Sequence, residues 1–474
     1  MGSRGRLNPL VTAAPGALVP VALYLAFPRG VFQAKLVIGA CLFVIMCGPV
    51  LLWPRRDNIL AYRQVGIYAS TVLVPLLGAT SLGAFAPHLL DVYARLLIVG
   101  ALAFVVGLLI GAQVGRAGRR SDRTSFGHPL DAGMAWQTVY RRARILGTGA
   151  AVTLFGSFVL LGYVPLLAAD RLSAKYGVGL YADGFARGRL AYHFALGLAS
   201  IIFPVLLIVA WRRRTFVDVA LCGLVAVGLA ASLSRGDFAS GPLLVGAALA
   251  IERRTRPTLI VAGVCLLFLA GSLSNELIFE KSRSGGASLS TRLAAGADDV
   301  RDHLLFINGF EREGSQFTNG RTITAKLLPG SDPARDPSTY AIRLTTGLQD
   351  TSLLASGGIR LPAPLWGFVS FGFPGAAAFC VISGLFIGWG TVRVRRLLDQ
   401  TRGRPGYAVN LVIATVYFDG IFVFMSNFFF TAFADVVGLV AAIMLGVLPW
   451  TALRRTGEDA VARPPGLVDA GRLS

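Results

Sequence analysis

Long apolar runs separated by short polar segments make up most of this chain. Twelve runs are long enough to cross about 30 Å of hydrocarbon, so the pattern predicts an all-α, polytopic membrane protein with about 12 transmembrane helices. The predicted spans cover residues 10–27, 36–53, 66–86, 92–114, 145–169, 191–211, 216–233, 237–251, 258–274, 363–390, 408–425 and 432–451. The only long polar segment, residues 275–362, separates the ninth span from the tenth.

This arrangement predicts four parts. Residues 1–274 form a transmembrane bundle, 275–362 a loop outside the membrane, 363–453 the last three spans, and 454–474 a disordered tail. Within the loop, apolar residues at helical spacing between Ser288 and Ile307 predict an amphipathic helix that lies against the membrane or the bundle; they are Leu289, Leu293, Val300, Leu304 and Ile307.

The charged residues predict which side of the membrane each segment faces. The chain carries 45 Lys and Arg against 25 Asp and Glu, and its formal net charge is +20. Nearly all of these charges lie between apolar runs, so we expect no nucleic-acid partner. Of the basic residues, 27 fall in segments on one side of the predicted spans, which places those segments and both termini in the cytosol. The segment 275–362, with ten basic and ten acidic residues, then faces outward.

The sequence gives little support for metal or cofactor chemistry. The five cysteines all lie inside apolar runs, which indicates neither disulfides nor a thiolate metal site. Asp298, Asp299, Asp302 and His303 resemble a group of metal ligands, but Arg301 lies among them, so a solvated helix face is the preferred interpretation. We predict no metal site and no cofactor.

Arginines and histidines on the outward side are the candidates for chemistry. A guanidinium group binds phosphate or pyrophosphate through paired hydrogen bonds and keeps its charge at any physiological pH. His88, His193 and His303 lie on or near the outer face and are natural candidates for a general base. Arg235 lies in a predicted tight turn, 234–237, which is either a plain exposed hairpin or lies below the membrane surface, where the charge of Arg235 is costly unless it faces a polar cavity.

Several short motifs, taken in order, resemble those of the oligosaccharide repeat-unit polymerases, the Wzy-type O-antigen polymerases. The resemblance covers roughly 160–390. Its motifs are Tyr163-Val164-Pro165-Leu166-Leu167 followed by Arg171, Ser232-Leu233-Ser234-Arg235-Gly236, Asn319-Gly320-Arg321-Thr322 running to Leu328-Pro329, and Gly357-Gly358 through Pro364 and Gly367 to Phe371-Gly372-Phe373-Pro374-Gly375. One position departs from the family: a Glu often follows the glycine that matches Gly367, where this chain has Phe368. If that Glu is catalytic in the family, this chain must use another group.

The resemblance implies a glycosyltransferase of the bacterial inner membrane. Such an enzyme moves a glycan from undecaprenyl pyrophosphate onto the sugar of a second lipid-linked repeat unit, outside the cytosol and without metal or nucleotide sugar. Its implied partners are the undecaprenyl-pyrophosphate-linked glycan, the lipid bilayer and, through the family, a chain-length regulator and a flippase.

Site residues can be assigned on this basis. As contacts to the pyrophosphate or glycan we expect first Arg171, Arg235 and Arg343, and behind them Arg321 and Arg360. As general base we expect His303 or His193, and after them Asp302. In the alternative interpretation the arginines only lock the loops, by pairing with Asp170, Asp237 and Asp350.

Two other functions stay open at the level of sequence. An O-antigen ligase, which passes the finished polymer to a different acceptor, has a similar outer loop with Arg and His. A transporter or flippase of lipid-linked sugars is compatible with twelve spans, although its long link is usually central and cytosolic, whereas here the long segment joins spans nine and ten.

Overall fold

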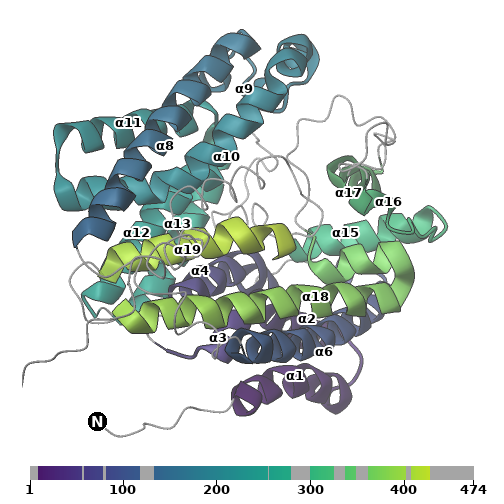
Figure 1. The fold of residues 1–474 in the computed structure, drawn as a ribbon. Coiled ribbons are helices and arrows are strands. Elements are labelled where there is room, and N and C mark those ends of the chain that lie inside the picture. The colour runs from purple at the N-terminus through teal and green to yellow at the C-terminus, as the bar shows by residue number, and fades with distance from the viewer. Residues whose placement is uncertain are drawn as a thin grey trace, which may run out of the picture.

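The computed structural model describes residues 9–55, 58–77, 82–117, 133–254, 256–278, 299–324, 337–347, 361–401 and 407–426, and every element in these ranges is a helix (Figure 1). The first group is α1 (Pro9–Ala26), α2 (Val31–Met46), α3 (Gly48–Leu52), α4 (Ile59–Tyr68), η1 (Ala69–Leu73), α5 (Val74–Leu77), η2 (Leu82–Ala84) and α6 (Pro87–Ala117). The second is α8 (Gly133–Leu161), η3 (Pro165–Leu167), α9 (Arg171–Tyr176), η4 (Gly179–Tyr181), α10 (Ala182–Arg213), α11 (Phe216–Ala231), α12 (Arg235–Glu252) and α13 (Pro257–Ile278). The third is α15 (Asp299–Arg312), α16 (Arg321–Thr324), α17 (Pro337–Thr346), α18 (Ala363–Thr401) and α19 (Tyr407–Ser426).

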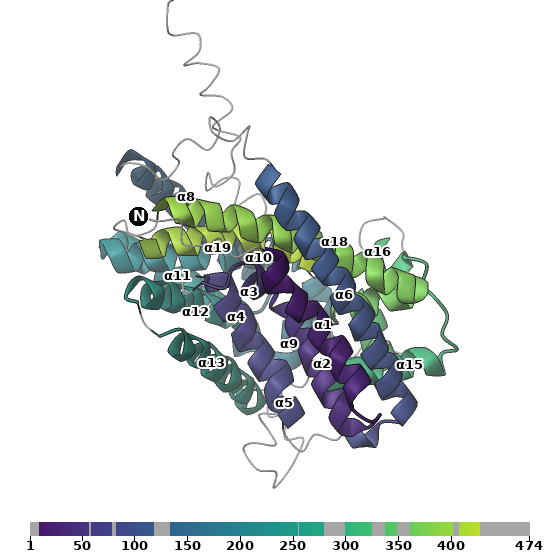
Figure 2. The ribbon, with the colours of Figure 1, turned by 90° about the horizontal axis from the view of Figure 1, so that it is seen from below.

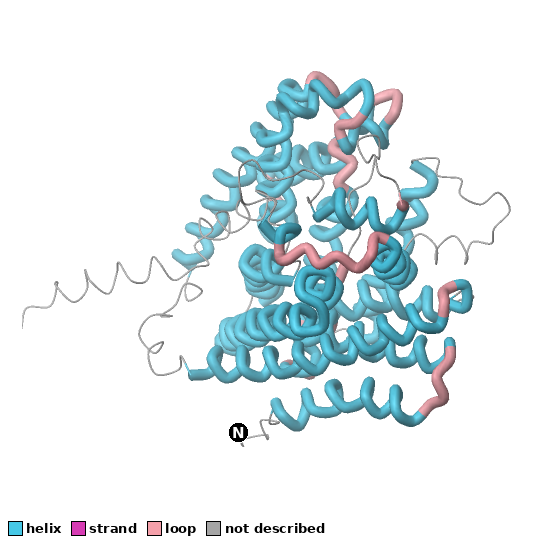
Figure 3. The backbone as a smooth tube through the Cα atoms, turned by 90° about the vertical axis from the view of Figure 1, so that its right-hand side faces the viewer, coloured by secondary structure: helices cyan, strands magenta, loops and turns pink. Residues whose placement is uncertain are grey.

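The predicted all-α class is confirmed for the described residues, and Figure 3 shows helices joined by short loops. Five helical segments there are long and apolar enough to cross a membrane: Ile59–Leu77, Pro87–Ala117, Tyr140–Leu161, Gly179–Arg213 and Ala363–Arg395. Five other predicted spans correspond to shorter apolar helices, and the ninth, 258–274, lies within α13. The last, 432–451, lies outside the described residues, as does the tail 454–474. The structure therefore indicates a membrane-embedded protein without giving the predicted count of twelve.

Large apolar side chains on the outside of these helices support the same conclusion. Val152 and Val159, seven residues apart on one face of α8, are 67% and 81% exposed, and Phe216 at the start of α11 is 86% exposed. A soluble protein rarely leaves so much apolar surface in water, whereas acyl chains cover it at no cost.

The helices form two groups that α19 connects. α1, α2, α6 and α18 lie side by side in one group (Figure 2), and α8, α10, α11 and α12 form the other, at the upper left of Figure 1. α19 packs against α18 in the first group and against α10 and α12 in the second.

Glycines allow α6 and α18 to pack with their backbones almost touching. On α6, Gly107 and Gly111 face the carbonyls of Val381 and Leu385, and a Cβ atom on either glycine would overlap these backbone atoms. Gly384 and Gly388 of α18 face α6 in the same way. Both helices thus carry a Gly-x-x-x-Gly motif, which is the spacing that brings transmembrane helices into close contact.

α18 is interrupted near its beginning, although the sequence predicts one continuous span over 363–390. Phe371 and Gly372 have non-helical dihedral angles, and Gly372 adopts φ 69° and ψ −156°, a conformation that only glycine takes readily. Gly367 before the break packs directly against Gly375 after it, so the chain folds back on itself there. The first turns of α18 thus form a hairpin with the rest of the helix.

A short loop satisfies the carbonyl groups that this break releases. The amide of Thr318 donates to the carbonyl of Val369 at 2.9 Å, and the amide of Asn319 donates to that of Ser370 at 3.1 Å. Buried backbone groups need such partners, because no water reaches them in a packed interior. The family-like segments around Asn319 and Phe371, distant in sequence, therefore lie together.

The described part of the predicted outer loop contains α15, α16 and α17, which we call the outer unit. Val300, Leu304 and Ile307 are each at most 1% exposed, so the predicted apolar face of α15 is confirmed; it packs against α17 and α6. Residues 288–298 of the predicted amphipathic helix lie outside the described ranges. The prediction for His303 was wrong: expected on the solvated face, it is only 3% exposed.

A second correction concerns the predicted tight turn at 234–237. Only Ser234 lies outside a helix, as the N-cap of α12, and Arg235 is the first residue of that helix. The reversal comes earlier, at Leu233, whose φ is 58°.

Candidate functional site

The end of α15 carries a cluster of charged residues that joins three helices, and we call it the 311–313 cluster. Nε2 of His88, in the first turn of α6, lies 3.1 Å from Oε2 of Glu311. Nη2 of Arg343 on α17 donates to Oε2 of Glu313 at 2.9 Å. Because Glu311 and Glu313 are only two residues apart, a histidine and an arginine from different helices each pair with a carboxylate at the same end of α15.

Arg343 is the most enclosed member of this cluster, with 22% of its side chain exposed. Its guanidinium lies over the ring of Tyr340 at 5.4 Å, and its Nε is buried without a hydrogen-bond partner. Burial and the nearby Glu313 carboxylate raise the pKa of Tyr340 to about 12, so this phenol keeps its proton. An unpaired buried N–H on a fixed cation is a group that a bound anion would satisfy.

His88, in the first turn of α6, is the accessible histidine of the 311–313 cluster. Its side chain is 64% exposed, and Glu311 holds one ring nitrogen, which leaves the other to exchange a proton with a substrate. The sequence places His88 near the outer face, but its pairing with a carboxylate more than 200 residues later has no local signal.

His303 is packed into the interior. Its Nδ1 lies 2.6 Å from the hydroxyl of Tyr93, a side chain with 0% exposure, and the two rings meet edge to face at 5.9 Å. This contact joins α15 to α6. The position suits a structural role and does not present His303 to a substrate.

The other predicted residues are distributed over several parts of the chain. Asp302 on α15 is half-buried, and Arg321 is exposed at the start of α16, so both belong to the outer unit with Arg343. Arg235 begins α12, and its side chain lies outside what the structure describes; Arg360, Asp237's side chain and Asp350 do too.

Arg171 and His193 lie in a separate part of the molecule. Arg171 is exposed in α9, which packs against η3 and η4, and His193 on α10 lies between the rings of Phe185 and Tyr192. Figure 1 shows α9 at the top and α17 on the right. The three arginines expected first thus belong to three different elements, α9, α12 and α17, and the described packing does not join α9 to α17.

The aspartate beside Arg171 caps a helix. Asp170 is the N-cap of α9, where it accepts hydrogen bonds from the amides of Leu172 and Ser173 and from the hydroxyl of Ser173. These bonds, led by that of the Ser173 hydroxyl, hold the pKa of Asp170 below its ordinary value. Arg343 pairs with Glu313, and its predicted partner Asp350 lies outside the described residues.

Phe368, at the position where the family that the sequence resembles often has a Glu, lies in a cluster of aromatic rings. Its ring centroid is 5.8 Å from Phe310, 6.4 Å from Phe317 and 5.3 Å from Phe373. These contacts join α15, the loop that contains Phe317, Thr318 and Asn319, and both arms of the α18 hairpin. A carboxylate at this position would be surrounded by aromatic rings. The carboxylates of the 311–313 cluster are instead Glu311 and Glu313.

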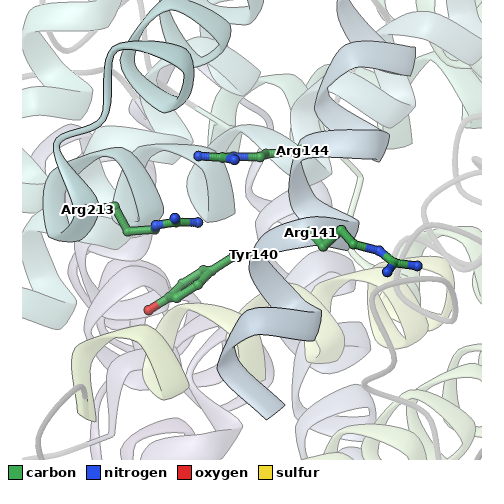
Figure 4. Close-up of a pocket in the computed structure, with 4 residues that line it drawn as sticks. All are labelled: Tyr140, Arg141, Arg144 and Arg213. Carbon is green, nitrogen blue, oxygen red and sulfur yellow. The ribbon is translucent and has the colours of Figure 1, made fainter. Parts of the chain in front are cut away.

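A second concentration of charge lies at the far end of the α8–α10 pair. Tyr140, Arg141, Arg144 and Arg213 line a cavity of about 380 Å³ (Figure 4). In the sequence these arginines indicate only which side of the membrane their segments face. Their convergence depends on the antiparallel packing of α8 and α10, which local sequence does not show.

Comparison of the whole chain with protein-family models, with curated proteins and with solved structures finds no match.

Proposed function

We propose that this chain is a membrane glycosyltransferase that polymerises undecaprenyl-pyrophosphate-linked oligosaccharide repeat units into a surface polysaccharide at the outer face of a bacterial inner membrane. The family resemblance of the sequence motivates the proposal. Its main structural support is Arg343, a partly enclosed arginine with a buried, unpaired Nε, which pairs with the same end of α15 as an exposed histidine–carboxylate pair.

The 311–313 cluster provides the groups that such a reaction needs. In the proposed step, His88 accepts the proton of an acceptor sugar hydroxyl, and Glu311 stabilises the resulting imidazolium. The hydroxyl oxygen bonds to the anomeric carbon of the donor glycan, while the bond from that carbon to the pyrophosphate breaks. Undecaprenyl pyrophosphate leaves, and Arg343, with Arg321 as a second cation of the outer unit, neutralises its charge.

A ligase is the second candidate, because the same groups would transfer a finished polymer to a different acceptor. A lipid-linked sugar flippase is less well supported, since transport needs no general base and gives no role to the His88–Glu311 pair.

The test is transfer by purified protein in detergent, with a lipid-pyrophosphate-linked oligosaccharide extracted from the native host. A product ladder that grows by one repeat unit is expected for the native chain. His88→Ala and Arg343→Gln should each lower the rate by at least about 100-fold, the usual contribution of a general base or of one charge-stabilising donor. Arg253→Gln changes an exposed arginine at the end of α12 and serves as the control.

The products separate the candidates. Transfer to another acceptor without a ladder would replace polymerase by ligase. A ladder that persists in both variants would remove the 311–313 cluster from the mechanism. Folded native protein that transfers nothing but moves the lipid across liposomes would identify a flippase.

A further inference from the structure

The cavity at the end of the α8–α10 pair carries an excess of positive charge. Three arginines line it, Arg141, Arg144 and Arg213, and among the described residues one carboxylate, Asp218 on α11, lies against two of them. Figure 4 shows Arg144 and Arg213 on the same side of α8 as the Tyr140 ring, with Arg141 extending from the other side.

Asp218 neutralises Arg144 and fixes its position. Nε and Nη2 of Arg144 donate to the two carboxylate oxygens at 2.6 and 3.0 Å, and Nη2 also reaches Oγ1 of Thr215 at 3.2 Å. Thr215 is the N-cap of α11 and donates to Asp218 at 2.6 Å. Asp218 is only 1% exposed, so its charge is committed to this arrangement.

Arg213 and Arg141 supply the remaining charge. Arg213 is 3.7 Å from Asp218, beyond hydrogen-bond distance, and lies over the ring of Tyr140 at 5.1 Å, which fixes the guanidinium plane. Arg141 is exposed at the rim of the cavity. Two guanidinium groups therefore border a cavity at which the one carboxylate in the described part of the chain is already paired.

The position of the cavity indicates what kind of anion reaches it. Tyr140 begins one membrane-spanning segment and Arg213 ends another, so the cavity lies where two antiparallel spans leave the membrane. Beside it, Trp211 is 51% exposed and Phe216 is 86% exposed. Exposed aromatic residues at the ends of spans are typical of the level at which lipid headgroups lie.

We propose that this cavity binds the phosphate headgroup of an anionic phospholipid. Arg213 contacts the phosphate oxygens inside the cavity, Arg141 adds positive charge at the rim from the other side of α8, and the acyl chains lie against the exposed apolar surface next to Phe216. Basic pockets between membrane helices recognise anionic lipids through this combination of fixed charge and adjacent apolar surface. The site is at the opposite end of the α8–α10 pair from α9 and is independent of the proposed transferase activity.

The test is a titration of the purified full chain in detergent with phosphatidylglycerol, followed by native mass spectrometry. One tightly bound lipid is expected. The variant Arg141→Gln/Arg213→Gln should bind it about thirtyfold more weakly, whereas the control Arg253→Gln/Arg254→Gln, an equal loss of charge on the exposed turn after α12, should stay within about twofold. Arg141→Gln alone leaves the Asp218 pairs intact and should weaken binding about fivefold, which decides the matter if the double variant does not fold.

Three results would overturn the proposal. Equal affinity for phosphatidylcholine would show that the site does not select anionic lipids. Equal weakening in the control would assign the effect to overall charge. Displacement of the lipid by millimolar glycerol 3-phosphate, with a matching rise in melting temperature, would identify a site for a soluble phosphate compound instead.

Discussion

The contact between Tyr93 and His303 shows how one hydrogen bond can attach the outer unit to the membrane bundle. Both side chains are buried, and the bond joins α6 to α15 across 210 positions of sequence. A buried polar group that loses its partner has given up its hydrogen bonds to water and gains none in return. Removing one partner of such a bond therefore destabilises the protein by more than the bond's net contribution to folding.

Tyr93→Phe removes only the hydroxyl and keeps the ring that packs against His303. We expect the free energy of unfolding to fall by about 1–3 kcal/mol, because Nδ1 of His303 loses its 2.6 Å partner. Thermal unfolding in detergent measures the change. Tyr181→Phe, which removes the hydroxyl of a half-buried tyrosine on η4, is the matched control.

The same variant helps to decide what His303 does. If it is structural, Tyr93→Phe and His303→Ala should both lower the melting temperature while the transfer rate per folded molecule stays nearly constant. A loss of transfer with unchanged stability would restore His303 as the base that the sequence analysis expected.

Candidate residues were only partly predictable from sequence. Residue types and rough sidedness single out Arg343, Arg321 and His88, since charged groups between apolar runs are visible in one dimension. The carboxylate that pairs with each of these residues cannot be predicted from the sequence. Arg343 pairs with Glu313, thirty positions away, because α15 and α17 pack together. The aromatic surroundings of Phe368 likewise depend on the hairpin in α18.

At the level of elements, the close packing of α6 against α18 depends on glycines, which have no side chain, at the points of contact. Gly111 lies against the backbone carbonyl of Leu385, and backbone cannot move aside as a flexible side chain can. Such close packing lets many weak backbone contacts form along the two helices, which is how small residues hold helices together in lipid.

Gly111→Val should therefore separate the two helices. We expect a loss of about 2 kcal/mol or more, seen as a lower melting temperature and an aggregated fraction in size-exclusion chromatography. Gly149→Val on α8 is the matched control, because a Cβ there meets no atom within 4 Å and the change in helix propensity is the same. An equal effect of both variants would mean that only helix propensity matters.

Helices were easier to predict than their interruptions. Apolar runs predicted helices through most of the described residues, because burying a backbone in lipid leaves few alternatives. The break at Phe371 was missed because apolar residues continue through it, and the local indication, Gly372 followed by Pro374, also occurs in continuous membrane helices.

For the whole molecule, the uneven distribution of arginine predicts an orientation in the membrane, and the fold supplies exposed positions at which labelling can test it. Ser315, in the exposed turn after α15, and Arg253, in the exposed turn after α12, are predicted to lie on opposite sides of the membrane. The native cysteines in the described residues are buried or half-buried, so background labelling should be low.

In intact cells, a membrane-impermeant maleimide should label Ser315→Cys and should label Arg253→Cys only after permeabilisation. This result is expected because segments rich in arginine stay in the cytosol. The unmodified chain gives the background. The reverse pattern would place the 311–313 cluster in the cytosol and would rule out the proposed reaction at the outer face.

The glycine contact between α6 and α18 also has a consequence for how the protein is made. Val381 follows Gly107 by roughly 270 residues, so at about 5–20 residues per second α18 leaves the ribosome some 15–50 s after α6. During that interval the grooved face of α6 is inserted in the bilayer without its partner, and lipid or helices made earlier than α18, such as α1 and α2, must cover it. The first group of helices is thus completed by one of the last segments to be translated, and a chain that terminates before α18 presents this face to membrane quality control.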